Sequence, residues 1–293
     1  MNRLLVVANP NSGRGRAIRK AEEFIYVANK MGFDPLLIAV DGKESMLSAI
    51  EEVLTTRNSK IFGLVAVGGD GLIHTLLPLL NSYMLPFTVL PSGTGNDFAR
   101  EIGNNKLSNI EIVKKISSTP RPIDSLVIEG ENGLFRACQV ASLGFDAIVN
   151  ERANSLKRIK GKIKYVFATI AELPLFKPIT FHVEIDGVDF SGESMLIAVA
   201  NGSCYGGGMK ICPDAKIDDG LLDLLILSKV NIPVLLRVFP RVYRGTHISH
   251  PAIKLARGKK VRIEAPTKAY ADGEFVSRLP IEISIDPHSL LVW

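Results

Sequence analysis

The segment Val67–Gly71 constrains the fold more than any other part of this 293-residue chain. It reads Val-Gly-Gly-Asp-Gly, ends the apolar run 62–66 and leads into a second apolar run at 72–77. A buried strand that ends at glycines and continues as a helix predicts backbone N–H groups that an anion can approach closely. Because a carboxylate repels phosphate, Asp70 suits a metal ion or a proton better. We therefore interpret the turn as a phosphate site with an additional role for Asp70.

The first 125 residues alternate between expected strands and expected helices. Apolar runs and helical periodicity predict strands at 4–9, 35–40, 61–67 and 87–90, and helices at 17–31, 45–54 and 72–80. This alternation indicates an α/β fold with a mainly parallel sheet that binds its ligand at the carboxyl ends of the strands. We place a domain boundary near residue 125.

Residues 126–288 have a different pattern, with short strands separated by turn residues. The expected strands are 126–129, 135–142, 179–185, 193–200, 221–227, 261–264 and 281–285, with helical insertions at 147–172 and 231–244. This pattern predicts an antiparallel β-sandwich. A last strand at 289–293 is expected to return to the first domain.

Charge and cysteine content limit the classes of partner and the compartment. The net charge is +5, and the nine Lys and Arg residues between Lys229 and Ile263 are accompanied by no Asp or Glu. Such a stretch fits an anionic partner or a solvated basic surface. Aromatic residues are not interleaved with the charges, which argues against nucleic acid. Three cysteines and the lack of an apolar run of ~18 residues indicate a cytoplasmic protein.

Three glycine-rich turns follow expected strands of the first domain, at 9–15, 68–71 and 91–98. None completes a dinucleotide-binding or Walker motif, and each alone is compatible with an ordinary tight turn. Together they lie at one edge of the expected sheet. Ser12, Thr94 and Asn96 add neutral polar groups that suit phosphate oxygens.

The order of these motifs resembles the soluble diacylglycerol kinase and sphingosine kinase family. The first domain has Asn-Pro-x-Ser-Gly at 9–13, Gly-Gly-Asp-Gly at 68–71 and Pro-Ser-Gly-Thr-Gly-Asn-Asp-Phe-Ala at 91–99. The second has Ser-Leu-Gly-Phe-Asp at 142–146, Tyr-Gly-Gly-Gly-Met at 205–209, Pro-Asp-Ala-Lys-Ile-Asp-Asp-Gly-Leu-Leu-Asp at 213–223 and Asp-Gly-Glu at 272–274. Gly-Gly-Asp-Gly is also found in NAD kinases, whereas the other strings are more specific.

The resemblance implies a cytoplasmic lipid kinase of phospholipid metabolism that uses ATP and Mg²⁺. Residues 1–125 would form a phosphofructokinase-like nucleotide-binding α/β domain, and residues 126–288 a lipid- and metal-binding β-sandwich, with the active site in the cleft. The residues implied to bind the nucleotide are Asn9, Asn11, Ser12, Gly13, Gly68, Gly69, Gly71, Gly93, Thr94, Gly95, Asn96 and Glu274.

The resemblance also assigns the catalytic and metal-binding roles. Asp70 would act at the reacting phosphate through Mg²⁺ or in accepting a proton, and Asp272 would be the general base for the acceptor hydroxyl. Taken alone, Asp272-Gly273 equally predicts a hairpin turn. Replacing either Asp by Ala is expected to abolish transfer and leave the fold intact.

A structural Mg²⁺ is a further implication of the resemblance. Its ligands would be the Asp219 carboxylate and the backbone carbonyls of Lys216 and Leu221. Asp97 and Asp124 would connect this ion to the nucleotide site through hydrogen bonds.

One residue departs from the family pattern. Thr75, after His74, stands where the family often has Glu. This departure leaves open a nucleotide-binding regulatory protein with weak catalysis. A second alternative is another small-molecule kinase of the same superfamily, such as an NAD kinase, although the string at 91–98 argues against it.

A kinase that acts on a membrane lipid must reach the bilayer surface. Basic and apolar residues recur at helical spacing in 152–172 and 234–244, which suits peripheral association with an anionic membrane or, equally, a helix packed on a core. Diacylglycerol-like lipids are the expected acceptors, and a homodimer is compatible with the sequence.

Overall fold

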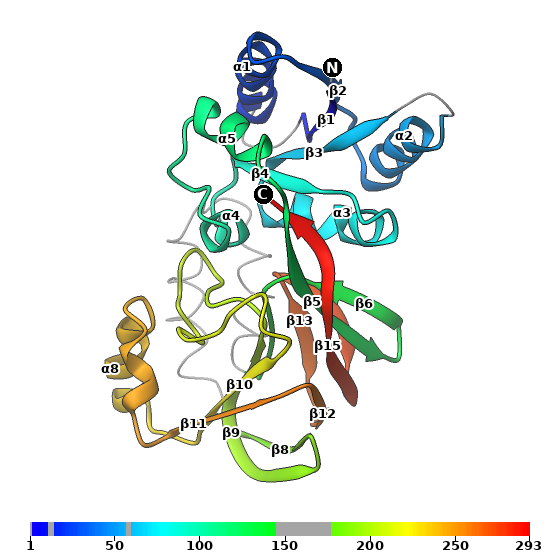
Figure 1. Cartoon of the computed structure of the whole chain (residues 1–293). Coiled ribbons are helices and arrows are strands. Elements are labelled where there is room, and N and C mark those ends of the chain that lie inside the picture. The colour runs from blue at the N-terminus through cyan, green and yellow to red at the C-terminus, as the bar shows by residue number, and fades with distance from the viewer. Residues whose placement is uncertain (1, 11–14, 57–59, 145–176) are drawn as a thin grey trace. The chain divides into compact units, whose positions relative to one another are not determined.

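The computed structural model describes residues 2–10, 15–56, 60–144 and 177–293 (Figure 1). The chain divides into two compact units, one of Met1–Ile123 with His288–Trp293 and one of Asp124–Pro287. No helix within these described ranges is long and apolar enough to cross a membrane. The helical insertion expected at 147–172 lies outside them.

The first unit contains a sheet of parallel strands in the order β4-β3-β1-β2. Its strands are β1 (Asn2–Ala8), β2 (Phe33–Ile38), β3 (Ile61–Gly68) and β4 (Phe87–Pro91). Strands β1, β3 and β4 consist largely of buried residues, as a sheet covered on both faces requires, whereas β2 buries only Phe33 and Ile38. Since the strands run in one direction, their carboxyl ends meet at one edge. The α/β prediction is confirmed for this part of the chain.

Five described helices belong to the first unit. They are α1 (Arg16–Lys30), α2 (Lys43–Thr55), α3 (Asp70–Ser82), α4 (Asp97–Glu101) and α5 (Asn109–Ile116). Helix α1 buries Ala17, Ala21, Phe24 and Ala28, one face of a helix, in the same core as α5. Helix α3 begins two residues earlier than predicted because Asp70 already has helical geometry, and an acidic residue is favourable in a first turn.

The end of the chain is anchored in the first unit. Strand β15 (Ile281–Val292) is one continuous strand, whereas two separate strands were predicted at 281–285 and 289–293. Val292 pairs in parallel with Phe87 of β4. The Trp293 ring stacks on Phe62 at 5.5 Å, and its indole N–H donates to the Ser118 carbonyl over 3.0 Å.

Nine described strand pairs of the second unit are antiparallel, as predicted. The strands are β5 (Arg121–Gly130), β6 (Gly133–Ala137), β7 (Val140–Gly144), β8 (Ile179–Ile185), β9 (Val188–Ala200), β10 (Leu222–Ser228), β11 (Ile253–Gly258), β12 (Lys260–Glu264), β13 (Lys268–Ala271) and β14 (Glu274–Arg278). Alternate residues of β8 are buried, the pattern of a strand with one face on a core. A main apolar core joins most of these strands.

Two predictions for the second unit were wrong in detail. The expected strand 135–142 is interrupted at Cys138 and Gln139, and its two parts pair with different strands. Strands β11, β13 and β14 were not predicted, since they are short and carry Lys, Arg or Glu. The helix expected at 231–244 is confirmed as α8 (Ile232–Val242), whose first turn is capped by the Asn231 side chain.

Candidate functional site

Two of the three glycine turns pack directly against each other at the carboxyl ends of β3 and β4. The Ser92 amide donates a hydrogen bond to the Gly68 carbonyl oxygen over 2.9 Å. A Cβ atom on Gly93 would lie 2.6 Å from the Cα atom of Gly69, closer than real Cβ atoms approach other atoms. Both positions need glycine because their main chains touch. The predicted meeting of these turns at one sheet edge is therefore present in the structure.

Asp70 lies where these two turns meet. Its Oδ1 atom accepts a hydrogen bond from the Phe98 amide over 3.1 Å. A Cβ atom on Gly95 would lie 2.7 Å from Oδ2, so this carboxylate fits only against a glycine. Among the described residues, Oδ2 accepts no hydrogen bond, and the side chain is partly exposed. One oxygen is thus fixed by the protein, while the other can receive a cation or a proton.

Asn96 fixes the conformation of the turn at 91–98. It has a positive φ of 53°, a conformation that Asn tolerates better than most residues. Its side chain accepts a hydrogen bond from the Gly93 amide over 3.0 Å and donates one to the Gly93 carbonyl over 2.8 Å. Its amide group therefore holds the loop closed, and the exposed Thr94 at the tip is free to contact a ligand.

The first glycine turn is only partly described. Ala8 is level with Val67 in the pairing of β1 with β3, so Asn9 lies at the same sheet edge as the other two turns. Asn11, Ser12 and Gly13 lie outside the described residues. Gly71 lies in the first turn of α3.

Two basic side chains that were not predicted bind the main chain of the turn at 91–98. Lys20 donates from Nζ to the Pro91 carbonyl over 2.5 Å, and Arg100 donates from Nη2 to the Gly95 carbonyl over 3.3 Å. Burial lowers the pKa of Lys20. Each residue belongs to the helix that follows a glycine turn, and this position in the sequence was the signal that could have identified it. Lys20 places positive charge where phosphate is expected, whereas the charge of Arg100 is offset by its ion pair with Asp97.

Asp97 has a structural partner in its own helix. Its buried carboxylate forms an ion pair with Arg100, one helical turn along α4. The pair as a whole carries little net charge. Its predicted connection to a metal site stays a prediction.

Thr75, which departs from the family pattern, and its neighbour His74 both lie in α3. Thr75 donates a hydrogen bond to the Gly71 carbonyl over 3.0 Å, so its hydroxyl is used within α3. Burial, together with the charge of Lys43, lowers the pKa of His74 to about 4. The imidazole is therefore neutral near pH 7. Neither side chain supplies the carboxylate that the family often has at position 75.

The pKa of His74 predicts a specific acid sensitivity. Since the folded-state pKa lies below the ordinary value of 6.5, the neutral ring stabilises the fold fully above pH 6.5. This contribution is lost as the pH falls to about 4, up to about 3 kcal/mol in the free energy of unfolding. In urea unfolding, His74→Gln should lose correspondingly less free energy of unfolding than wild type between pH 6.5 and pH 4. His182→Gln, at an exposed site, should behave as wild type. Parallel curves for His74→Gln and wild type would contradict the prediction.

In the second unit, Asp272 closes a hairpin and holds a distant loop. It lies between β13 and β14 with a φ of 51°, as the turn reading of Asp272-Gly273 predicts. Its carboxylate accepts hydrogen bonds from the backbone amides of Cys138 (2.7 Å), Gln139 (3.0 Å) and Val140 (3.2 Å). These amides turn toward Asp272 where β6 gives way to β7, which explains the break in the expected strand. The three donors stabilise the ionised carboxylate.

Asn201, which was not predicted, connects this loop to the other motifs of the unit. Its buried side-chain amide donates to the carbonyls of Asp124 (3.0 Å) and Cys138 (2.9 Å). The Asp124 carboxylate in turn accepts from the Gly220 amide over 2.7 Å. Asp124, the 138–140 loop, Asp272 and the 216–221 turn therefore form one polar network. A polar Asn directly after a run of buried apolar residues was the available signal for Asn201.

The predicted metal ligand Asp219 is bound by an arginine. Oδ2 of Asp219 forms an ion pair with Arg257, and Oδ1 accepts from the Leu221 amide over 3.2 Å. Nε of Arg257 also lies 3.0 Å from Oδ1 of Asp223, its cross-strand neighbour in β10 and β11. Burial raises the pKa of Asp223, an effect that Arg257 opposes.

One guanidinium thus supplies the positive charge that an ion held by Asp219, Lys216 and Leu221 would supply. No group of three or more His, Cys, Asp or Glu side chains suited to a metal occurs in the described parts of the chain. The arrangement fits arginine better than Mg²⁺. The metal set therefore stays a prediction.

Arg257 provides a test of this conclusion. Chelation with EDTA should change the Tm of the wild-type protein by less than about 1 °C, whereas Arg257→Gln should lower it by about 3 °C. Adding Mg²⁺ should partly restore the variant, because the freed carboxylates could then bind a cation. Arg262→Gln, which breaks an exposed pair with Glu264, is the matched control and should change little. A wild-type Tm that falls by several degrees with EDTA would show that the turn needs a metal.

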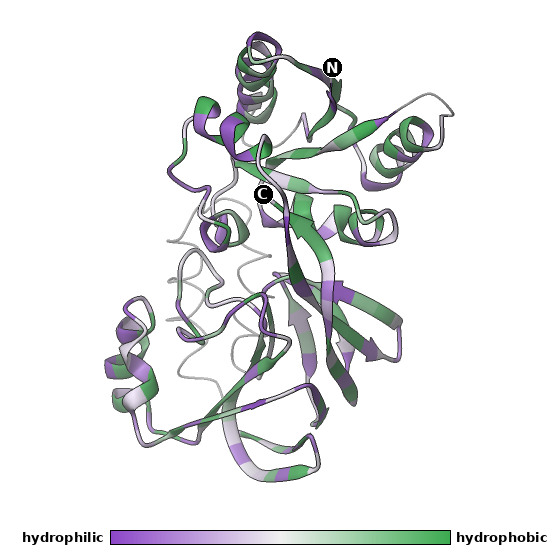
Figure 2. Cartoon of the chain, in the orientation of Figure 1, coloured by the Kyte–Doolittle hydropathy of each residue, from purple (hydrophilic) through white to green (hydrophobic). Residues whose placement is uncertain are grey.

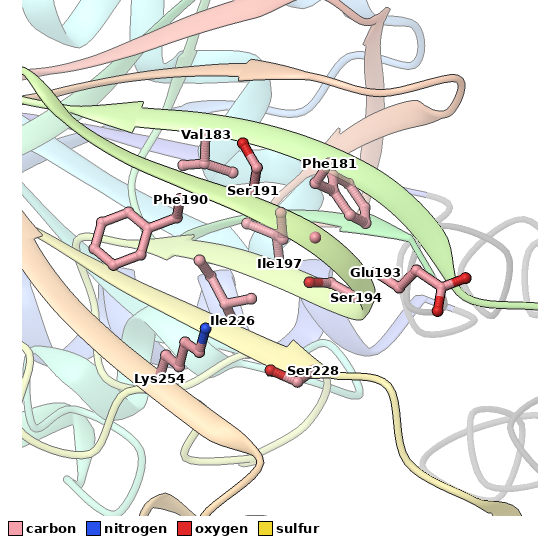
Figure 3. A pocket seen from close by; sticks show the side chains of 11 residues that line it. Phe181, Val183, Phe190, Ser191, Glu193, Ser194, Ile197, Ile226, Ser228 and Lys254 are labelled. Atoms are coloured by element: carbon pink, nitrogen blue, oxygen red, sulfur yellow. The ribbon is translucent and has the colours of Figure 1, made fainter.

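The remaining nucleotide residue, Glu274, is exposed at the first position of β14. Figure 3 shows a pocket in the second unit with an apolar floor that includes Phe181, Phe190 and Ile197 and a rim that includes Lys254. Its lining comes from β8, β9, β10, β11 and neighbouring residues and includes none of the predicted site residues. The pocket is therefore separate from the candidate site.

Comparisons with known proteins agree with these motifs. The family model described as "Diacylglycerol kinase catalytic domain" matches residues 3–128. The model described as "YegS C-terminal NAD kinase beta sandwich-like domain" matches residues 139–293. Together they cover most of the two units.

Individual relatives match over nearly the whole chain. A diacylglycerol kinase of Mycobacterium tuberculosis is 33% identical over 100% of this chain and 95% of its own length. One from Bacillus subtilis is 30% identical over 96% of this chain and 93% of its own length. The crystal structure of a diacylglycerol kinase from Bacillus anthracis has a TM-score of 0.70 at 18% identity, covering 99% of this chain and 96% of the other. The last likeness concerns the fold alone.

Proposed function

The chain belongs to the diacylglycerol kinase family, whose members are phosphotransferases with an alcohol acceptor, and from this premise we propose that it transfers the γ-phosphate of ATP to the free hydroxyl of diacylglycerol or a related lipid. The contact between the turns at 68–71 and 93–96, with Asp70 at their junction, is the observation that carries the proposal. Phosphoryl transfer needs mainly positioning and neutralisation of charge, and this junction offers both.

We assign nucleotide binding to the first unit. Glycine-rich main chain at the carboxyl ends of parallel strands suits the phosphates of ATP. Lys20 adds positive charge beside the turn at 91–96, and Arg100 holds its main chain. The free Oδ2 atom of Asp70 fits a divalent cation, and Mg²⁺ bound there would neutralise charge on the phosphates. Asn9 and Thr94 complete the described part of this set.

Asp272 is the proposed proton acceptor for the lipid hydroxyl. Its carboxylate accepts hydrogen bonds from three backbone amides. A carboxylate held in this way can accept the hydroxyl proton as the bond to phosphorus forms. The backbone amides also fix the orientation of the carboxylate, which general base catalysis requires.

Two alternatives define outcomes of the test. The first alternative, a kinase with a dinucleotide acceptor, is motivated by the NAD-kinase-like description of the second family model. The second alternative, a regulatory protein that binds nucleotide with weak catalysis, is motivated by Thr75, whose hydroxyl is hydrogen-bonded within α3.

The proposal is tested with γ-labelled ATP, Mg²⁺ and a total lipid extract, followed by identification of the labelled product. The proposal expects a phosphorylated lipid with a glycerol backbone. Label transferred to added NAD but to no lipid would favour the NAD-kinase-like alternative. Nucleotide binding without any labelled product would favour the regulatory alternative.

A further inference from the structure

Helix α8 is attached to the second unit by one face only. Leu235, Val238 and Val242 are buried, at the spacing of one side of a helix. Leu235 belongs to an apolar cluster that also includes Ile211 and Leu227. These contacts fix the helix and determine which residues face outward.

The outward face has an apolar centre. Leu236 is 52% exposed, and Pro233 and Pro240, three residues before and four after it, are also exposed. Ile232, one turn before Leu236, is 40% exposed. Figure 2 shows apolar and polar residues alternating along α8. An exposed row of this kind on a short helix is unusual unless it meets a partner.

Beside this row lies a row of arginines. Arg237 and Arg241 lie one turn apart on α8, Arg244 lies two residues past its end, and all three are exposed. Within the described residues none of them forms an ion pair, although other cations of the same basic stretch do, such as Lys229 with Glu193 and Arg257 with Asp219. The charges of α8 are therefore available to an external anion.

We infer that α8 docks the protein on an anionic lipid bilayer, with Leu236 entering the boundary between headgroups and acyl chains and the three arginines contacting lipid phosphates. The inference rests on the proposed function, because a diacylglycerol acceptor lies in a bilayer. An apolar row flanked by cations matches a surface that is apolar inside and anionic outside. Eleven residues suffice for a helix lying in the interface. Duplex nucleic acid would match the arginines and leave Leu236 and Ile232 in water.

The test compares sedimentation with vesicles of phosphatidylcholine alone and with roughly one third phosphatidylglycerol. Wild type should bind the anionic vesicles, less so at high salt. The triple variant R237Q/R241Q/R244Q should bind them about 100-fold more weakly, and Leu236→Asp about 10-fold more weakly. Thermal unfolding of each variant checks that the fold is retained.

The matched control removes the same charge elsewhere. Changing the exposed Lys106, Lys254 and Lys259 to Gln also takes the net charge from +5 to +2, and should weaken vesicle binding less than about threefold. Equal losses in both triple variants, or wild-type binding by the α8 variant, would overturn the inference. Loss of duplex DNA binding by the α8 variant with unchanged vesicle binding would also overturn it.

A water-soluble, short-chain diacylglycerol separates docking from chemistry. The α8 triple variant should phosphorylate this substrate at the wild-type kcat/KM while failing on vesicles. If wild type does not phosphorylate it, the proposed function fails, and the vesicle result still stands by itself.

Discussion

Asp70→Asn should lower the rate of phosphate transfer at least about 10³-fold and weaken nucleotide binding far less. Asn keeps the shape that fits against Gly95 and can still accept the hydrogen bond from the Phe98 amide. What it removes is the negative charge, and with it the affinity of Oδ2 for a cation. Steady-state kinetics with ATP and Mg²⁺ give the rate, and equilibrium titration gives the nucleotide affinity.

Asp34→Asn, at an exposed ion pair with Arg3 in the same unit, is the control and should leave the rate unchanged. If the Asp70→Asn enzyme retained more than about a tenth of the wild-type rate, Asp70 would not be required for the reaction.

Asp272→Ala should lose activity, as expected from the sequence, and should also lose stability. Without the carboxylate, the backbone amides of Cys138, Gln139 and Val140 lose their acceptor, and all three residues are buried. Since an unsatisfied buried donor costs about 1–3 kcal/mol, the free energy of unfolding should fall by about 3 kcal/mol or more. Urea unfolding measures the loss.

Asp272→Asn separates the structural role from the chemical one. It should be destabilised less than the Ala variant and still transfer phosphate at least about 10²-fold more slowly, measured where it is fully folded. The control is Asp186→Asn: Asp186 also has a positive φ in a hairpin turn and accepts the Lys259 and Lys260 amides. The Asp186→Asn variant should be less stable than wild type and fully active. A folded Asp272→Asn with nearly normal turnover would exclude Asp272 as the general base.

The sequence predicted the features that repeat locally. Strand and helix alternation located β1 to β4 within a few residues, and it was clearest for β1, β3 and β4, which are continuous runs of largely buried residues. Gly68, Gly69 and Gly93 identified the junction correctly, because close contact between two main chains permits few other residues.

Contacts between distant residues could not be predicted in this way. The break between β6 and β7 depends on Asp272, about 130 residues further along the chain. Arg257 meets Asp223 only through the register of β10 with β11, and one residue of slip would place it on the other face. The place of Lys20 in the helix after a glycine turn could have marked it as a candidate, but its partner, the main-chain carbonyl of Pro91, lies 71 residues away and could not be predicted.

The most direct test of the account is transfer of labelled phosphate by the purified protein to defined diacylglycerol. With γ-labelled ATP and Mg²⁺, wild type should form labelled phosphatidate, and Asp70→Asn should form at least about 10³-fold less. A wild-type protein that binds ATP and labels neither diacylglycerol nor any other lipid hydroxyl would contradict the account.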